Sequence, residues 1–216
     1  MDTSEIRRKA REHLQSNWAL SIGVAAVACL LGGLLIGVSF VPDKVFSLTW
    51  KISDTFRITL KVGFLSLAAF LIGGVLQLGY ARFLLKQHDG KELDFNDLFS
   101  QFDRFGTGFA QHFLRTLYTF LWSLLLIVPG IVAALSYAMT PFILEEHPEL
   151  TASEAIARSK ELMDGHKMDL FLLDLTFLGW AILAALTANI GYLFLNPYLN
   201  AAYAVFYREI TQGPQQ

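Results

Sequence analysis

The sequence predicts an all-α fold, a polytopic membrane bundle of about six transmembrane helices, and composition is the first reason. The chain of 216 residues is 54% hydrophobic and 17% charged, whereas soluble globular proteins are about 45–50% apolar and about 25% charged. Its mean hydropathy is +0.44. The apolar residues also occur in long blocks separated by polar segments, which a single buried core does not explain.

Charge and cysteine content exclude several other classes of protein. The formal net charge is −2, and no basic arm or acidic tail points to nucleic acid. The single cysteine, Cys29, lies inside an apolar block, so neither a disulfide within one chain nor a cysteine-based metal site is possible.

The first two spans are predicted at 18–41 and 61–85. Residues 1–16 carry four basic residues and apolar residues at helical spacing, which predicts a short surface helix before the first span. The apolar block 18–41 is longer than the roughly 7–15 residues of a signal-peptide core, so we expect it to be retained. Residues 43–60 alternate between polar and apolar and fit either a small hairpin or a loop on the bilayer interface.

A row of apolar residues follows the second span. Its members recur at helical spacing, so we expect one amphipathic helix lying flat at the interface, or alternatively a docking face for a protein partner. They are Phe95, Leu98, Phe99, Phe102 and Phe105.

The next two spans are predicted at 108–128 and 131–144, joined by a tight hairpin at Pro129 and Gly130. One fused helix would be about 55 Å long, against a hydrocarbon core of roughly 30 Å. A second amphipathic helix then opens with Thr151 and Glu154 at the spacing of a capping box and ends at Gly165.

The last two spans are predicted at 168–187 and 190–207, with Pro197 kinking the latter. With both termini inside, few basic residues fall on the outside, which fits the positive-inside rule. The inside set is Arg7, Arg8, Lys9, Arg11, Arg82, Lys86, Lys91, Arg104, Arg158, Lys160, Lys167 and Arg208. The outside set is Lys44, Lys51, Arg57 and Lys61.

Arg115 and Asp174 are the candidate site residues with the strongest physical argument. Each lies a short way into a predicted span entered from the cytoplasmic side. A charge in the bilayer costs about 2.5–3.5 kcal/mol on insertion scales, so we expect the two to face each other or share a polar cavity. The alternative is that Arg115 extends to the headgroups and Asp174 pairs locally.

A second polar cluster surrounds Pro197, because a proline inside a span frees a backbone carbonyl that a substrate could contact. It consists of Asn196, Pro197, Tyr198 and Asn200, and Gln77 of the second span could join it or bond a neighbouring helix. The alternative is a kink whose polar groups are satisfied by neighbouring helices.

No catalytic, metal or cofactor motif is present in the sequence. The histidines do not occur at ligand spacing, and phosphate-binding glycine loops, nucleophile elbows and CxxC pairs are absent. The nearest approach, Glu145-Glu146-His147, reads as a solvated turn before Pro148. We therefore expect a non-enzymatic protein without cofactor or metal.

Several segments together resemble the bacterial integral-membrane family of unknown function numbered 975, over nearly the whole chain except residues 43–60. They include 121–131, 135–141, Gly165-His166-Lys167, Phe177-Leu178-Gly179-Trp180 and Asn196-Pro197-Tyr198. Met168 stands where relatives are expected to have tryptophan. More loosely, the hairpin and the helix after it are similar to the membrane domain of some glycerophosphodiester phosphodiesterases, which hints at proximity to lipid.

The resemblance implies a bacterial inner-membrane protein, and the expected role is binding of membrane lipid or of a protein partner, including a second copy. The alternative is a transporter or channel for a small solute or ion, with a polar site between the spans 108–128, 168–187 and 190–207. A polar cavity there would favour transport, whereas a tight core with an exposed phenylalanine face would favour binding. A lipid-modifying enzyme is a third reading, and it would need Asp174, or Glu145 with His147, in an accessible cleft.

Overall fold

The computed structural model describes residues 3–15, 17–32, 64–187 and 191–212, and every regular element in these ranges is helical. The predicted all-α class is therefore confirmed. The longer helices are α1 Thr3–Gln15, α2 Trp18–Gly32, α3 Phe64–His88, α4 Phe105–Leu125, α5 Ile127–Ser136, α7 Ala152–Leu162, α8 Lys167–Leu186 and α9 Tyr192–Gln212. The short ones are α6 Thr140–Glu146 and the 3-10 helices η1 Phe95–Leu98 and η2 Phe102–Arg104.

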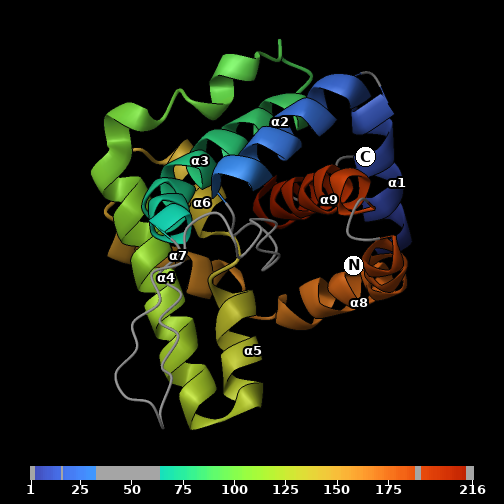
Figure 1. Ribbon diagram of the computed structural model, residues 1–216. Coiled ribbons are helices and arrows are strands. Elements are labelled where there is room, and N and C mark those ends of the chain that lie inside the picture. The colour runs from blue at the N-terminus through green and yellow to red at the C-terminus, as the bar shows by residue number, and fades with distance from the viewer. Residues whose placement is uncertain (1–2, 16, 33–63, 188–190, 213–216) are drawn as a thin grey trace, which may run out of the picture.

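The N-terminal helix is part of the core. α1 lies beside α9 (Figure 1), and its Ile6, Ala10 and Leu14 are at most 1% exposed. These residues repeat every four positions and so form one stripe on the helix. The surface helix predicted before the first span is therefore a helix, but its apolar stripe packs against protein.

α3 is the central helix, because it contacts α2, α4, α6, η1 and α9. It covers most of the span predicted at 61–85 and continues to His88. The first predicted span, 18–41, corresponds to α2 in its first part. Its remainder and the loop 43–60 lie outside the described residues.

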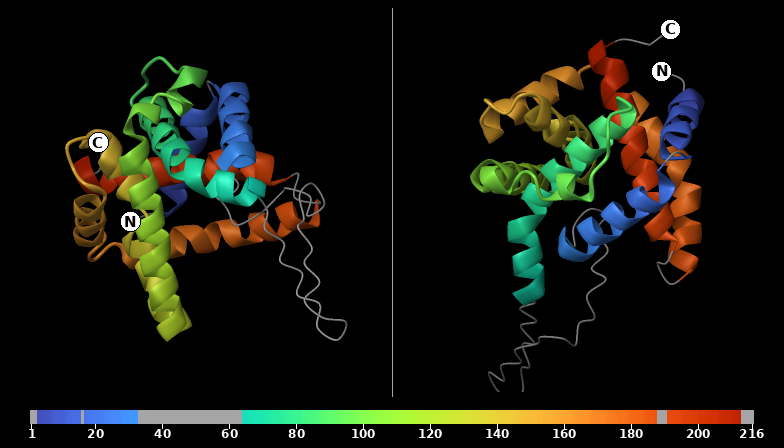
Figure 2. Two further views of the ribbon diagram at one scale, coloured as in Figure 1. Left: turned by 60° about the vertical axis from the view of Figure 1, so that its left-hand side comes forward. Right: turned by 90° about the horizontal axis from the view of Figure 1, so that it is seen from above.

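The helical hairpin forms three residues earlier than predicted. The chain turns at Leu126, whose backbone is extended, and Pro129 and Gly130 lie inside the first turns of α5. Pro129 fits there because the first N–H groups of a helix have no partner within it. Figure 1 shows α4 and α5 running side by side away from the other helices, and the left view of Figure 2 shows the same extension.

The span predicted at 131–144 is divided into two helices. α5 ends at Ser136 and α6 begins at Thr140, with Pro141 at its start. Pro141 has no N–H to donate, so one continuous helix would lose a hydrogen bond at this point. The sequence carries a signal for this interruption in Ser136, Thr140 and Pro141, which the prediction of one span did not use.

The phenylalanine row, which consists of Phe95, Leu98, Phe99, Phe102 and Phe105, does not form the single amphipathic helix that was predicted. Phe95 and Leu98 lie in η1, Phe99 follows η1, Phe102 lies in η2 and Phe105 begins α4. Asp94 caps η1 by accepting a hydrogen bond from the backbone N–H of Asn96, at 3.0 Å. Such local bonds favour a turn over a regular helix.

The C-terminal third follows the sequence prediction closely. Thr151 and Glu154 form the capping box of α7, and Gly165 has a φ of +84°, which glycine adopts without strain. α8 matches the span predicted at 168–187. α9 contains Pro197 and extends beyond the span predicted at 190–207 to Gln212.

Candidate functional site

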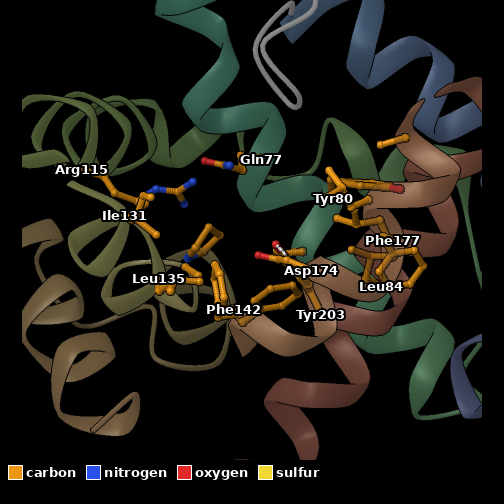
Figure 3. A pocket seen from close by; sticks show the side chains of 18 residues that line it. Gln77, Tyr80, Leu84, Arg115, Ile131, Leu135, Phe142, Asp174, Phe177 and Tyr203 are labelled. Atoms are coloured by element: carbon orange, nitrogen blue, oxygen red, sulfur yellow. Dashed lines mark hydrogen bonds between the residues drawn. The ribbon is translucent and has the colours of Figure 1, made fainter. Parts of the chain in front are cut away.

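A cavity of about 550 Å³ lies between α3, α4, α5, α6, α8 and α9. Such a volume suits a small-molecule site. Most of the lining is apolar, and Figure 3 shows the polar exceptions projecting into it. The lining consists of Gln77, Tyr80, Ala81, Leu84, Arg115, Ile131, Ala134, Leu135, Ala138, Pro141, Phe142, Phe171, Asp174, Phe177, Leu178, Ala181, Leu199 and Tyr203.

Arg115 and Asp174 both line this cavity. Arg115 extends from α4 on one side, and Asp174 of α8 and Tyr203 of α9 lie on the other (Figure 3). The hydroxyl of Tyr203 donates a hydrogen bond to Oδ1 of Asp174 at 2.6 Å. Among the described residues, no ion pair joins Arg115 to Asp174, and the Arg115 guanidinium has no hydrogen-bond partner. The cavity therefore holds a cation and an anion that do not neutralise each other by direct contact.

Of the other predicted polar residues, one lines the cavity and two do not. Gln77 lines the cavity, and its side-chain oxygen accepts a hydrogen bond from Nε2 of Gln111 at 3.3 Å. Asn196 and Asn200 do not line it. The Asn196 side chain is buried, and Nδ2 of Asn200 donates to the Asn196 carbonyl at 2.9 Å. These two asparagines therefore lie away from the charged groups of the cavity.

Tyr203 is the cavity residue that the sequence reasoning missed. Its hydroxyl is the partner of Asp174, and it comes from the same helix as the asparagines that were singled out instead. A tyrosine in an apolar helix gives no signal by itself. Only the packing of α8 against α9 brings the two side chains together.

The predicted phenylalanine face is exposed. Phe95, Phe99, Phe102 and Phe105 are 36–41% exposed, and only Leu98 is fully buried. The rings form a row, with centroids 6.0 Å apart for Phe95 and Phe99 and 6.1 Å apart for Phe99 and Phe102. Leu98, the last residue of η1, is buried because its side chain packs into the hydrophobic core.

An ion cluster around the buried side chain of Arg208 joins helices that are distant in sequence. The guanidinium of Arg208 in α9 donates from Nη1 to Oε1 of Glu146 and from Nη2 to Oδ2 of Asp89, the latter at 2.8 Å. Glu146 also accepts a hydrogen bond from the Tyr207 hydroxyl at 2.5 Å. The Arg208 side chain is 9% exposed. One arginine therefore ties α9 to the ends of α3 and α6.

A second ion cluster lies beside η1. Nζ of Lys86 donates to Oδ1 of Asp97 at 2.6 Å, and Arg82 lies within 3.8 Å of both Asp97 and Glu145. Gln101 donates from Nε2 to Oε2 of Glu145 at 2.8 Å. The Glu145 carboxylate therefore contacts Gln101 and Arg82. The lipid-modifying enzyme considered above would need Glu145 in a cleft with His147.

His13 and His88 form a ring contact between α1 and the end of α3, with centroids 4.6 Å apart. Burial, together with a smaller effect of the neighbouring His13, lowers the pKa of His88 to about 4. Burial also lowers the pKa of His13. Both imidazoles are therefore neutral in the folded protein near pH 7.

We expect the protein to lose stability as the pH falls from about 6.5 towards about 4. In this window the unfolded chain binds a proton at His88 and the folded chain does not, so acid favours unfolding. The lowered pKa of His13 acts in the same direction. Partial exposure of His88 limits its contribution to about 1–2 kcal/mol. Thermal denaturation measured against pH should show this loss, and His88→Gln should reduce it. An unchanged pH dependence in His88→Gln, or the same reduction in the exposed control His147→Gln, would contradict the assignment.

The described residues contain no group of three or more His, Cys, Asp or Glu side chains placed to hold a metal ion. The cavity has one carboxylate, one guanidinium and hydroxyl groups. Such groups can bind and orient charged parts of a ligand.

Two stretches of the described helices are long and apolar enough to cross a membrane. One is Ile127–Glu146, which comprises α5, α6 and the turn between them, and the other is Lys167–Leu186, which is α8. The fold and cavity therefore define an all-helical protein with two candidate spans and a largely apolar cavity that contains separated charges.

Comparison of the sequence with known protein families gives a match. Residues 124–213 match the family described as "Protein of unknown function (DUF975)", which confirms the predicted resemblance over this part of the chain. The match covers α5 to α9 and includes Asp174 and Tyr203. No curated protein and no solved structure gives a match.

Proposed function

We propose that the chain is a multi-pass protein of the bacterial inner membrane that binds a membrane lipid in the cavity between α3, α4, α5, α6, α8 and α9. The proposal includes six spans, with both termini in the cytoplasm. It also takes the role to be binding and not catalysis. The apolar lining of the cavity is the observation that carries it, because thirteen of its eighteen lining residues are apolar.

Exposed apolar surface supports the membrane part of the proposal. In α8, Trp180, Ile182 and Leu183 are all more than half exposed. At the turn between α4 and α5, the exposed fraction reaches 73% at Leu124 and 78% at Ile127. A soluble monomer rarely exposes so continuous an apolar surface, whereas a bilayer would cover it.

The distribution of charge supports the proposed orientation. The ion clusters of Arg208 and Lys86 involve the end of α3, the end of α6 and η1, which are the segments assigned to the cytoplasmic side. The exposed apolar tips of α4, α5 and α8 lie at the other ends of their helices. This separation is typical of a protein with one end in water and the rest in lipid.

Transport of a small solute is the alternative, and one observation favours it. Arg115 and Asp174 bring opposite charges into a cavity bordered by α4, α8 and α9, the three helices where a polar site was predicted. A polar solute could use both charges. The predominance of apolar lining residues favours lipid over such a solute.

The exposed phenylalanine row fits the same proposal. Aromatic rings at the end of a span are suited to the interfacial region of a bilayer. A protein partner or a second copy of the chain docking on Phe95, Phe99, Phe102 and Phe105 is the competing use of this surface.

Native mass spectrometry of the full chain, released gently from its membrane, tests the proposal. We expect retained lipid, and we expect the variant Ala134→Phe, which fills part of the cavity, to retain about tenfold less. Ala134 lines the cavity and is exposed, so the larger ring does not displace buried core residues. Ala185→Phe is the matched control, on an exposed alanine of α8 outside the lining.

Two outcomes would count against lipid binding. Protein that is released without lipid and retains a small polar solute would favour transport, and a flux assay in liposomes would follow. Equal lipid retention in Ala134→Phe and Ala185→Phe would place the bound lipid elsewhere on the protein.

A further inference from the structure

The two charged groups of the cavity have different hydrogen-bonding states. Within the described part of the chain, the Arg115 guanidinium has no hydrogen-bond or ion-pair partner, although Arg115 is only partly exposed. Asp174 accepts one hydrogen bond from Tyr203 through Oδ1 at 2.6 Å, and its Oδ2 has no partner there. Arg115 therefore retains all its donors, and Asp174 retains an acceptor atom.

Buried or half-buried charges are normally paired, because leaving them unpaired in an apolar environment is unfavourable. Arg115 and Asp174 do not pair with each other, since no ion pair joins them in the described part of the chain. A ligand that brings an oxyanion to Arg115 and a cation to Asp174 would satisfy both. A ligand with only one charge would leave the other group unpaired.

We propose that the cavity binds a zwitterionic amphiphile that has a phosphate or carboxylate next to a primary ammonium group. Arg115 binds the oxyanion, and Oδ2 of Asp174 accepts a hydrogen bond from the ammonium. The acyl chains lie along the apolar wall that Ile131, Leu135 and Phe142 contribute. This inference rests on the lipid-binding function proposed above and names the chemical class of the lipid.

The chemistry of each group sets the expected selectivity. A guanidinium is planar and can donate two parallel hydrogen bonds to one phosphate or carboxylate. A carboxylate oxygen distinguishes a primary ammonium, which has three N–H donors, from a quaternary ammonium, which has none. The Tyr203 hydroxyl holds the Asp174 carboxylate in place and leaves Oδ2 for the ligand.

The experiment measures binding of four lipids with identical oleoyl chains to the delipidated full-length chain in detergent, by native mass spectrometry. The lipids are phosphatidylethanolamine, phosphatidylcholine, phosphatidylglycerol and diacylglycerol. We expect phosphatidylethanolamine to bind about tenfold tighter than the other two phospholipids. All three phospholipids should bind more tightly than diacylglycerol, which lacks the oxyanion.

Two variants separate the contributions of the two charges. Asp174→Asn should remove the preference for phosphatidylethanolamine over the other phospholipids, and Tyr203 can still donate to the amide oxygen, so the fold is retained. Arg115→Gln should remove the preference for phospholipids over diacylglycerol, and Arg115→Lys should restore part of it. Asp164→Asn and Arg158→Gln are controls at exposed positions outside the cavity and should bind as the unmodified chain does.

The outcomes distinguish this inference from the proposed function. If all four lipids bind equally and Ala134→Phe weakens them all, lipid binding stands and the headgroup assignment is overturned. If no lipid binds saturably, both are overturned. If O-phosphoethanolamine without acyl chains binds as tightly as the lipid, the ligand is a free zwitterion, which overturns the amphiphile and favours transport.

Discussion

Replacing Arg208 by methionine is expected to lower the free energy of unfolding by about 3–5 kcal/mol, because it removes the buried cation that Glu146 and Asp89 share. The side chains of Glu146 and Asp89 are 28% and 22% exposed, and both contact the Arg208 guanidinium. Among the described residues, Asp89 keeps one other cation, the exposed Lys91 at 3.1 Å, whereas Glu146 keeps only the hydrogen bond from Tyr207. Methionine fills a similar volume, so the loss comes from the charge. The measurement is thermal denaturation of the purified chain in detergent, where we expect a shift of about 10 °C.

A matched control distinguishes this buried cluster from ordinary surface ion pairs. Arg8 pairs with Glu12 at 2.8 Å on the exposed face of α1, where the two side chains are 61% and 55% exposed. Arg8→Met should cost at most about 0.5 kcal/mol. Neutralising the stranded carboxylates through Glu146→Gln and Asp89→Asn should restore part of the stability lost in Arg208→Met. Equal effects of the two arginine substitutions, or no restoration, would show that the cluster does not act as a unit.

The helices themselves could be predicted from sequence because their signals are local. The capping box at Thr151, the helix 168–187 and the helical stripe of the first residues depend on neighbours within a few positions. The turn at Leu126 was placed three residues too late because Pro129 and Gly130 are strong turn residues in general. Here Pro129 satisfies a different local rule, at the start of a helix.

The candidate site could be predicted only in part, since its residues come from distant parts of the chain. Arg115 and Asp174 were recognisable because charges are rare inside apolar segments. Tyr203 and the Arg208 cluster gave no such signal, because tyrosine is common in apolar helices and Arg208 lies at the end of a predicted span. Their partners are 29 and 62 residues away along the chain. Only tertiary packing brings these groups together.

Replacing Gly79 by alanine is expected to destabilise the protein by several kcal/mol. A Cβ at this position would lie 2.0 Å from the carbonyl oxygen and 2.6 Å from the carbonyl carbon of Leu98. These are backbone atoms of η1, so they cannot rotate away as a side chain would. Relief requires η1 to move away from α3, which exposes Leu98 and weakens the contacts of Asp97 with Lys86. Overpacking of this kind typically costs about 1–3 kcal/mol and more where backbone must shift.

Gly179→Ala provides the comparison that isolates this steric effect. Gly179 lies within α8, and nothing is within 4 Å of the position that its Cβ would occupy. Alanine there should be neutral or stabilise the helix by about 0.5–1 kcal/mol, because glycine has the lower helix propensity. Thermal denaturation of the two variants should therefore give shifts of opposite sign or very different size. A small shift for Gly79→Ala would mean that η1 can leave α3 at little cost. The phenylalanine row that begins in η1 would then be a mobile surface, whereas the close contact at Gly79 predicts that α3 holds it rigidly.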